Sequence, residues 1–346
     1  MTPGQRRGIA AAILAALAYA FTIPVTKVFV AGTSPWLLAG ILYLGSGLGL
    51  TVLLLASHRS WSVPLSDTPR LLGAIVCGGV IAPVLMLHGL RGVTGSAASL
   101  LLVCEGVFTS LLAWVIFREH LDRRIVIGFV SITAGAVLLA AAPGIAGSLP
   151  MTAAGLVLAA CLFWAMDNNL TRTVSLSDPM QVAAAKGLVA GITNTLLGTL
   201  VGAQWPAPRV ALLGAIVGFV GYGLSLALFV YALRELGTAR TGAYFSTAPF
   251  VAALMSVWFL GEPITSALAV AGAFMALGVW LHVTERHVHE HLHEAQEHEH
   301  GHEHDEHHRH HDPDEAVPHW HSHRHVHPVV RHGHPHFPDA HHRHEH

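Results

Sequence analysis

Ten apolar runs, each about 20 residues long, constrain this chain more than any other feature. A helix of that length crosses the hydrocarbon core of a bilayer, where backbone polar groups must be satisfied within helices or closed barrels. Charged residues make up only 12% of the chain, and the last 60 positions hold 12 of the 21 acidic ones. We therefore expect an all-α polytopic membrane protein with ten transmembrane helices. The predicted spans are residues 8–31, 35–57, 70–90, 95–117, 124–142, 152–172, 179–202, 209–233, 239–260 and 263–283.

The ten runs form two copies of five. Residues 71–76 and 212–217 have the same sequence, LLGAIV, at an offset of 141. Because five is odd, the second copy enters the membrane from the opposite side, as in the inverted repeats common among secondary transporters. If the two copies exchange conformations, an inward-open cavity becomes outward-open, so the pattern favours a transporter. Other pairs that agree at offsets of 143 to 145 are Tyr19 with Trp164, Lys27 with Arg172, Ser34-Pro35 with Asp178-Pro179, Arg91 with Arg234, and Glu119 with Glu262.

Several segments carry a resemblance to a known family. Residues 101–114 continuing to Glu119, and residues 248–254 continuing to Leu260-Gly261-Glu262-Pro263, resemble the two EamA repeats of the drug/metabolite transporter superfamily. Residues 163–165 and 231–234 are similar to that family too. The resemblance spans roughly residues 8–283. It implies two inverted halves around a central cavity lined mostly by helices one to four and six to nine, with helices five and ten outside.

The chain departs from the family pattern at two places. Glu105-Gly106 stands where the family often has Glu-Pro, so we expect a softer glycine kink in helix four, whereas Pro249 keeps the proline in helix nine. The basic residue often found early in the second helix of a repeat is replaced by Leu42-Tyr43 in the first copy, while Lys186 occupies the matching region of the second. The two halves are therefore chemically unequal.

Three segments follow from these patterns: a first EamA-like repeat over residues 1–143, a second over 150–284, and a His-rich tail over 285–346. Lysine and arginine favour the cytoplasmic side of a membrane protein. With the N-terminus inside, eleven such residues lie on cytoplasmic segments, against Lys27, Arg91 and Arg209 near the outer side. We expect a multi-pass protein of the plasma (inner) membrane with both termini cytoplasmic.

Ionisable residues inside a span are costly and face a cavity or a partner. Glu105, Asp167, Lys186 and, nearer an end, Lys27 are the candidates. Glu105 lies deepest, and a carboxyl group in a poorly solvated cavity can exchange a proton with either side. We interpret it as the coupling or substrate-binding group. The alternative is a static salt bridge of Glu105 or Asp167 with Lys186.

Aromatic and amide side chains extend the candidate site. Asn168 and Asn169 follow Trp164 within about one helical turn and could help to hold an amino or metal cation, or could simply hydrogen-bond between helices. Tyr and Trp often anchor at the membrane interface. Tyr19, Tyr222 and Tyr244 are deep enough to favour the cavity instead.

Some repeated polar and small residues have a structural interpretation. Glu119 and Glu262 each precede a helix, where a carboxylate complements the positive end of the helix dipole. Glycines 45, 47 and 49 and the pair 214 and 218 allow close helix contact. The three cysteines lie inside predicted spans without C-x-x-C spacing, so we expect small buried side chains there.

The tail contains 24 of the 28 histidines, many at every second position, and has four arginines against twelve acids, a formal charge of −8. Imidazole and carboxylate without thiols favour Ni, Cu and Zn over Mn or Mg. Its few apolar residues predict disorder without metal. Alternatively, the imidazoles buffer or sense pH, or the tail is only a solvated extension. The candidate metal ligands are His287, His289, His291, His293, His298, His300, His302, His304, His307, His308, His310 and His311.

Three functions remain open at this stage. The first is a secondary transporter that exports a small metabolite or cation and requires no cofactor, with a tail that binds divalent metal. The second is an exporter of Ni, Co or Zn fed by the tail, although the spans contain few metal ligands. The third is a membrane-anchored metal sensor or store. Nothing indicates an enzyme or a nucleic-acid partner; the expected partners are the lipid bilayer, the substrate and metal ions, and homodimer formation is left open.

Overall fold

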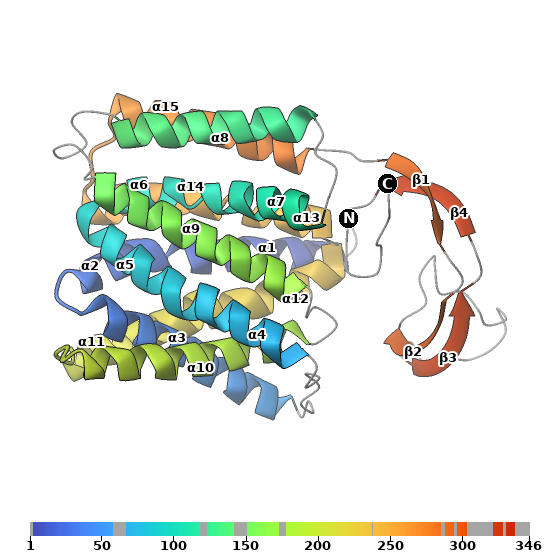
Figure 1. The fold of residues 1–346 in the computed structure, drawn as a ribbon, viewed down its shortest axis with the longest axis horizontal. Helices are drawn as coiled ribbons and strands as arrows, with labels where there is room; N and C mark the ends of the chain where they lie inside the picture. The colour runs from blue at the N-terminus through green and yellow to red at the C-terminus, as the bar shows by residue number, and fades with distance from the viewer. Residues whose placement is uncertain are drawn as a thin grey trace. The chain divides into compact units, whose positions relative to one another are not determined.

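The structure is a computed structural model. It describes residues 3–57, 67–117, 123–141, 151–172, 178–236, 238–284, 288–293, 296–302, 321–327 and 330–335. Contacts divide the chain into a helical unit, residues 1–285, and a tail unit, residues 286–346. Figure 1 shows the helices of the first unit side by side, running roughly along one direction.

The first copy runs from α1 to α8. Its elements are α1 (Pro3–Ala20), α2 (Thr22–Val30), α3 (Pro35–Ala56), α4 (Thr68–Ala74), the π-helix η2 (Ile75–Ile81), α5 (Ala82–Gly92), α6 (Gly95–Leu101), α7 (Cys104–Phe117) and α8 (Arg123–Ala141). The second copy comprises α9 (Met151–Arg172), α10 (Pro179–Leu200), α11 (Pro208–Gly218), the π-helix η3 (Phe219–Leu224), α12 (Ser225–Leu236), α13 (Thr238–Phe245), α14 (Ala248–Leu260) and α15 (Ser266–Val283).

The helices confirm a multi-pass membrane protein. Among the described residues, nine helical stretches are long and apolar enough to cross a membrane. The tenth predicted span forms α10, a 22-residue helix of lower hydropathy. Its polar residues Gln181 and Asn194 are 3% and 0% exposed, so they face neighbouring helices. The predicted all-α fold of two five-helix repeats is therefore confirmed for the helical unit.

The two copies are interrupted at equivalent places. Helix three contains η2 and helix eight contains η3, about 144 residues later. Helix four breaks at residues 102–103 and helix nine at residues 246–247, again 144 apart. Gly106 lies three residues after the break in helix four, and Pro249 lies two residues after the break in helix nine, so both helices bend just before these residues. Since both copies break alike, the break does not depend on a proline.

The packing between copies follows the inverted symmetry. Helix α1 packs on α12, and its counterpart α9 packs on α5, while α3 packs on α10 and α6 on α14. The predicted glycine contacts are confirmed. A methyl group on Gly45 would overlap the Ala215 carbonyl, and one on Gly218 would overlap the Leu42 carbonyl. Gly47 and Gly187 face each other in the same way, so α3 lies at backbone contact with its neighbours.

Helices five and ten form a pair at one edge, as the family resemblance implied. Figure 1 shows α8 and α15 together along one side of the bundle, and they contact each other extensively. The Ser131 hydroxyl donates to the Phe274 carbonyl at 2.7 Å. At one end of the pair, the His282 ring lies 3.2 Å from the Ile125 carbonyl. This pair supports the bundle without lining the pocket described below.

The tail unit contains two short pairs of strands. Strand β1 (Val288–His293) pairs antiparallel with β4 (Val330–Pro335), and β2 (Gln296–His302) pairs with β3 (His321–His327). Histidine at every second position has the period of a β-strand, which accounts for strand pairing in these four segments. Of the candidate ligands, those lying outside the described residues are His287, His304, His307, His308, His310 and His311.

Candidate functional site

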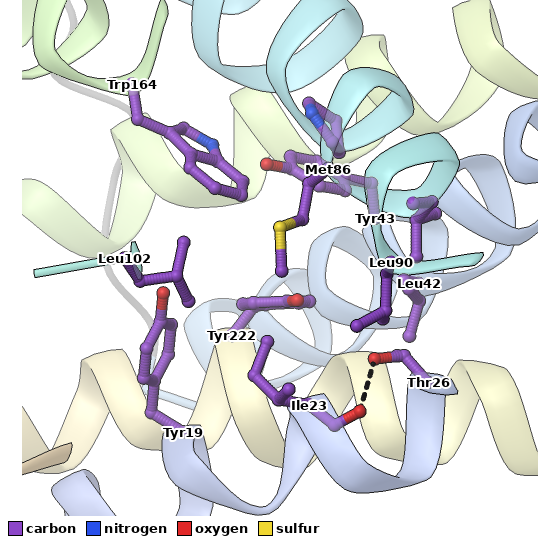
Figure 2. Close-up of a pocket in the computed structure, with 12 residues that line it drawn as sticks. Tyr19, Ile23, Thr26, Leu42, Tyr43, Met86, Leu90, Leu102, Trp164 and Tyr222 are labelled. Carbon is purple, nitrogen blue, oxygen red and sulfur yellow. Dashed lines mark hydrogen bonds between the residues drawn. The ribbon is translucent and has the colours of Figure 1, made fainter. Parts of the chain in front are cut away.

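A small pocket lies inside the helical unit, lined mainly by aromatic and aliphatic side chains. Figure 2 shows the rings of Tyr222, Tyr43 and Trp164 around Met86, with Tyr19 beside Leu102. The centroid of the Tyr222 ring lies 6.1 Å from that of Tyr19, in an edge-to-face arrangement, and 5.9 Å from that of Tyr43, in a tilted arrangement. The lining residues are Tyr19, Ile23, Thr26, Leu42, Tyr43, Pro83, Met86, Leu87, Leu90, Leu102, Trp164 and Tyr222.

The lining combines both repeats. Helices one to four of the first copy contribute most of it, and helices six and eight of the second contribute Trp164 and Tyr222. This agrees with the expected cavity for helices one to four, six and eight. The rings offer faces that attract apolar groups and cations.

The π-helix η2 positions two of the rings. The Tyr43 hydroxyl donates to the Gly78 carbonyl at 2.7 Å, and the Trp164 indole N–H donates to the same oxygen at 3.0 Å. The Asn194 amide donates to the adjacent Gly79 carbonyl at 2.9 Å. A π-helix shifts the backbone hydrogen-bond pattern, and side chains can then satisfy carbonyls that an α-helix would use. The pocket rings and this segment are thus directly connected.

Glu105 lies next to the pocket, three residues after the lining residue Leu102. It follows the break in helix four and is half-buried. Asn168 lies one turn after Trp164, and its amide donates to Glu105 Oε1 at 2.8 Å and to Thr109 Oγ1 at 3.3 Å. Among the described residues, no lysine or arginine forms an ion pair with Glu105. Among the described side chains, its direct hydrogen-bond partner is therefore an amide.

Asp167 and Lys186 form the ion pair that sequence reasoning offered as the alternative. Lys186 Nζ lies 2.5 and 2.7 Å from the two Asp167 oxygens, and the Asp167 side chain is 8% exposed. The Thr171 hydroxyl donates to Asp167 Oδ1 at 2.9 Å. A methyl group on Gly78 would overlap the Asp167 carboxylate, so this pair lies against η2. Asp167 is thereby neutralised inside the bundle.

Ionic side chains also join helix ends at the side of the pocket near Leu90. Lys27 Nζ donates to the carbonyls of Leu90 and Val93, both at 2.6 Å. Glu262 accepts from the backbone N–H of Gly95 at 2.6 Å and of Ser96 at 2.8 Å. Glu262 was expected to complement the helix that follows it in sequence. It caps α6 of the other repeat instead, because that N-terminus lies beside the end of α14; Glu119 lies outside the described residues.

Some residues that the sequence predicted for the cavity do not line this pocket, and some residues that line it were not predicted. Tyr244 packs against the cluster of Ala11, Ala12 and Ala232 and is not among the residues that line this pocket. The Asn169 amide donates to the Thr109 and Ala165 carbonyls, which makes it an interhelical contact. Tyr43 was noted only as a departure from the family, and that departure was the available signal. Nothing in the sequence distinguished Met86 from other apolar residues.

Metal ligands do not gather in the helical unit. In the part of the chain that the structure describes, no three His, Cys, Asp or Glu side chains lie close enough to hold an ion. Cys104 and Cys161 are buried, and the Cys161 thiol lies 3.6 Å from the Leu101 carbonyl. Glu105 and Asp167 each have the polar partners described above. The described spans thus contain a largely aromatic and aliphatic pocket and no group of three metal ligands.

Comparison with known proteins agrees with the fold. Residues 6–141 and 151–284 each match the EamA-like transporter family. A protein of Methanothermobacter thermautotrophicus described as an uncharacterized transporter is 32% identical over 207 residues, which cover 58% of this chain and 60% of that protein. The chain therefore spans about three fifths of this relative's length. A crystal structure with a TM-score of 0.59 and 20% identity covers 81% of this chain and 96% of the other, which supports the fold alone.

Proposed function

The chain belongs to the EamA-like transporter family, and from this we propose that it exports a small organic molecule by alternating access. The observation that carries the proposal is the aromatic pocket, which both repeats line and which has a carboxyl group without a cationic partner among the described residues at its edge. Ring faces suit an apolar body, and Glu105 suits a proton or an amine. The substrate class is therefore a small amphiphilic metabolite or organic cation.

In this proposal the roles of the two carboxyl groups differ. Glu105 exchanges a proton, or binds the substrate's positive group, as access alternates. Asp167 stays paired with Lys186 and holds α9 against α10. Asn168 orients Glu105 through its hydrogen bond. Trp164, one turn earlier on the same helix, lines the pocket. These roles are supported by the different partners of the two groups.

The proposed orientation has both termini in the cytoplasm of a cell bounded by the plasma membrane. Its support is the bias of lysine and arginine, eleven on one side against three on the other. The Lys27, Arg91 and Glu262 side is then the outer side. The tail lies inside, where its histidines bind a divalent ion of the Ni, Zn or Cu type.

Export of the metal itself is the second candidate, favoured by the 24 histidines of the tail. A path for a divalent ion through lipid needs several convergent ligands. The described spans bring no such group together. We therefore place the metal on the tail and an organic molecule in the pocket.

The test compares cells that express the full chain, Glu105→Gln, and a version ending at Glu285. Metabolites and metals are quantified in medium and cytoplasm by mass spectrometry. Glu235→Gln, which alters an exposed carboxyl group, is the matched control. The full chain and Glu235→Gln should enrich an organic compound in the medium, and Glu105→Gln should abolish that enrichment.

The tail truncation separates the two candidates. The organic export should persist without the tail, and cellular Ni, Zn and Co should be the same with the full chain as with Glu105→Gln. Metal efflux that disappears with Glu105→Gln, without any organic compound exported, would contradict the proposal.

A further inference from the structure

The outer ends of helices one and three hold each other by reciprocal capping. Lys27, on α2, binds two carbonyls at the C-terminal end of α5. Arg91, on α5, donates from Nε to the Val30 carbonyl at 3.0 Å and from Nη2 to the Thr33 carbonyl at 2.9 Å. Cations are stabilised at helix C-termini, where carbonyls lack backbone partners. Each helix thus supplies the cap of the other.

The first turn of helix four is held on the same side of the protein by a negatively charged side chain, that of Glu262. Both Glu262 oxygens accept from backbone N–H groups at the start of α6, where the helix dipole is positive. Glu262 follows Gly261, which ends α14 with φ of 66°, a conformation that favours glycine. Through this contact the second repeat holds an element of the first.

These contacts lie across the outer end of the pocket. Leu90 lines the pocket and is 0% exposed, while its own carbonyl is bound by Lys27. Thr26, which precedes Lys27, also lines the pocket. Separation of helices one and three at this end must therefore break the contacts of Lys27 and Arg91.

Such contacts are suited to repeated breaking. Their partners are backbone groups at helix ends near the membrane surface, where water can replace a lost protein partner. A hydrogen bond exchanged for water changes free energy far less than one lost in an apolar interior. The contacts can therefore close the pocket without making closure permanent.

We propose that Lys27, Arg91 and Glu262 form a lock that closes the outer end of the pocket in this conformation. The free energy of this lock contributes to which conformation the unliganded transporter occupies. This inference rests on alternating access in the proposed function, but it does not depend on the identity of the substrate.

The test measures access to the pocket from each side, so no substrate is needed. Met86→Cys is the reporter, in a full-length background with Cys77→Ala, Cys104→Ala and Cys161→Ala. A membrane-impermeant maleimide is applied to right-side-out and inside-out vesicles, and labelling rates are compared. Arg209→Gln removes an exposed positive charge from the outer side and is the matched control.

Arg91→Gln and Glu262→Gln should each raise the ratio of outside to inside labelling about tenfold, the change that roughly 1.4 kcal/mol produces in an equilibrium. The milder Glu262→Asp serves if a stronger variant does not give a folded protein. A ratio that changes no more than in Arg209→Gln, or labelling that rises equally from both sides, would overturn the lock.

Discussion

Glu105 and Asp167 lie close in the helical unit, yet their surroundings differ. Asp167 is neutralised by Lys186 and receives a further hydrogen bond from Thr171. Glu105 has the amide of Asn168 as its side-chain partner among the described residues. A neutralised carboxyl group holds helices together, whereas one without a cation is available to a proton or a substrate. The different partners of the two groups are the basis for the different roles proposed for them.

The Asp167 and Lys186 pair gives a prediction about stability. Removing one partner of a buried pair leaves an uncompensated charge and costs about 3 to 5 kcal/mol. Asp167→Asn or Lys186→Met should therefore lower the thermal unfolding midpoint of the purified protein strongly. The double variant should be more stable than either single one, because no unpaired charge remains. Additive losses in the double variant would show that the two side chains act independently.

At the scale of elements, glycine contacts between α3 and its neighbours fix the distance between the repeats. Gly45→Ala should destabilise the protein by about 1 to 3 kcal/mol, the usual cost of overpacking, since the added methyl group would overlap the Ala215 carbonyl. Gly155→Ala is the matched control, because nothing lies within 4 Å of its added methyl group. There the helix should gain up to about 1 kcal/mol from the better helix former.

Thermal unfolding of both glycine variants in the same detergent measures this difference. A thermal unfolding midpoint for Gly45→Ala equal to or above that of Gly155→Ala would show that α3 can move away from Ala215 at no cost in stability.

The elements also show what the sequence could and could not predict. Apolar length and the LLGAIV repeat identify the helices and their duplication, because both properties are local in the chain. The π-helices were not predicted, whereas bends in helices four and nine were expected from Gly106 and Pro249. The carbonyls of η2 receive side chains that are distant in sequence, such as those that reach the Gly78 carbonyl. Glu262 shows the same limit, since its partner lies 166 and 167 residues away.

For the whole molecule, the site was only partly predictable. Glu105, Asp167 and Lys186 stood out because charge is rare in the spans. Their pairing did not follow, since either acid could have met the lysine. Part of the aromatic lining was predicted from the depth of a ring within its span, as with Tyr19 and Tyr222. Met86 and Leu90 could not be selected, because apolar residues of the pocket and of the lipid-facing surface have the same composition.

The division into two units predicts that the tail can be removed without loss of the transporter. Residues 1–285 and 286–346 each make their own set of contacts. A version ending at Glu285 should keep the thermal unfolding midpoint of the full chain within about 2 °C, because the loss of surface residues outside the core costs little. Equilibrium dialysis against Ni²⁺ should show that bound metal falls to the background of the helical unit, where the described residues offer no three-ligand group. A truncated protein that unfolds early would show that the tail supports the helices, and retained Ni²⁺ would place the metal site within them.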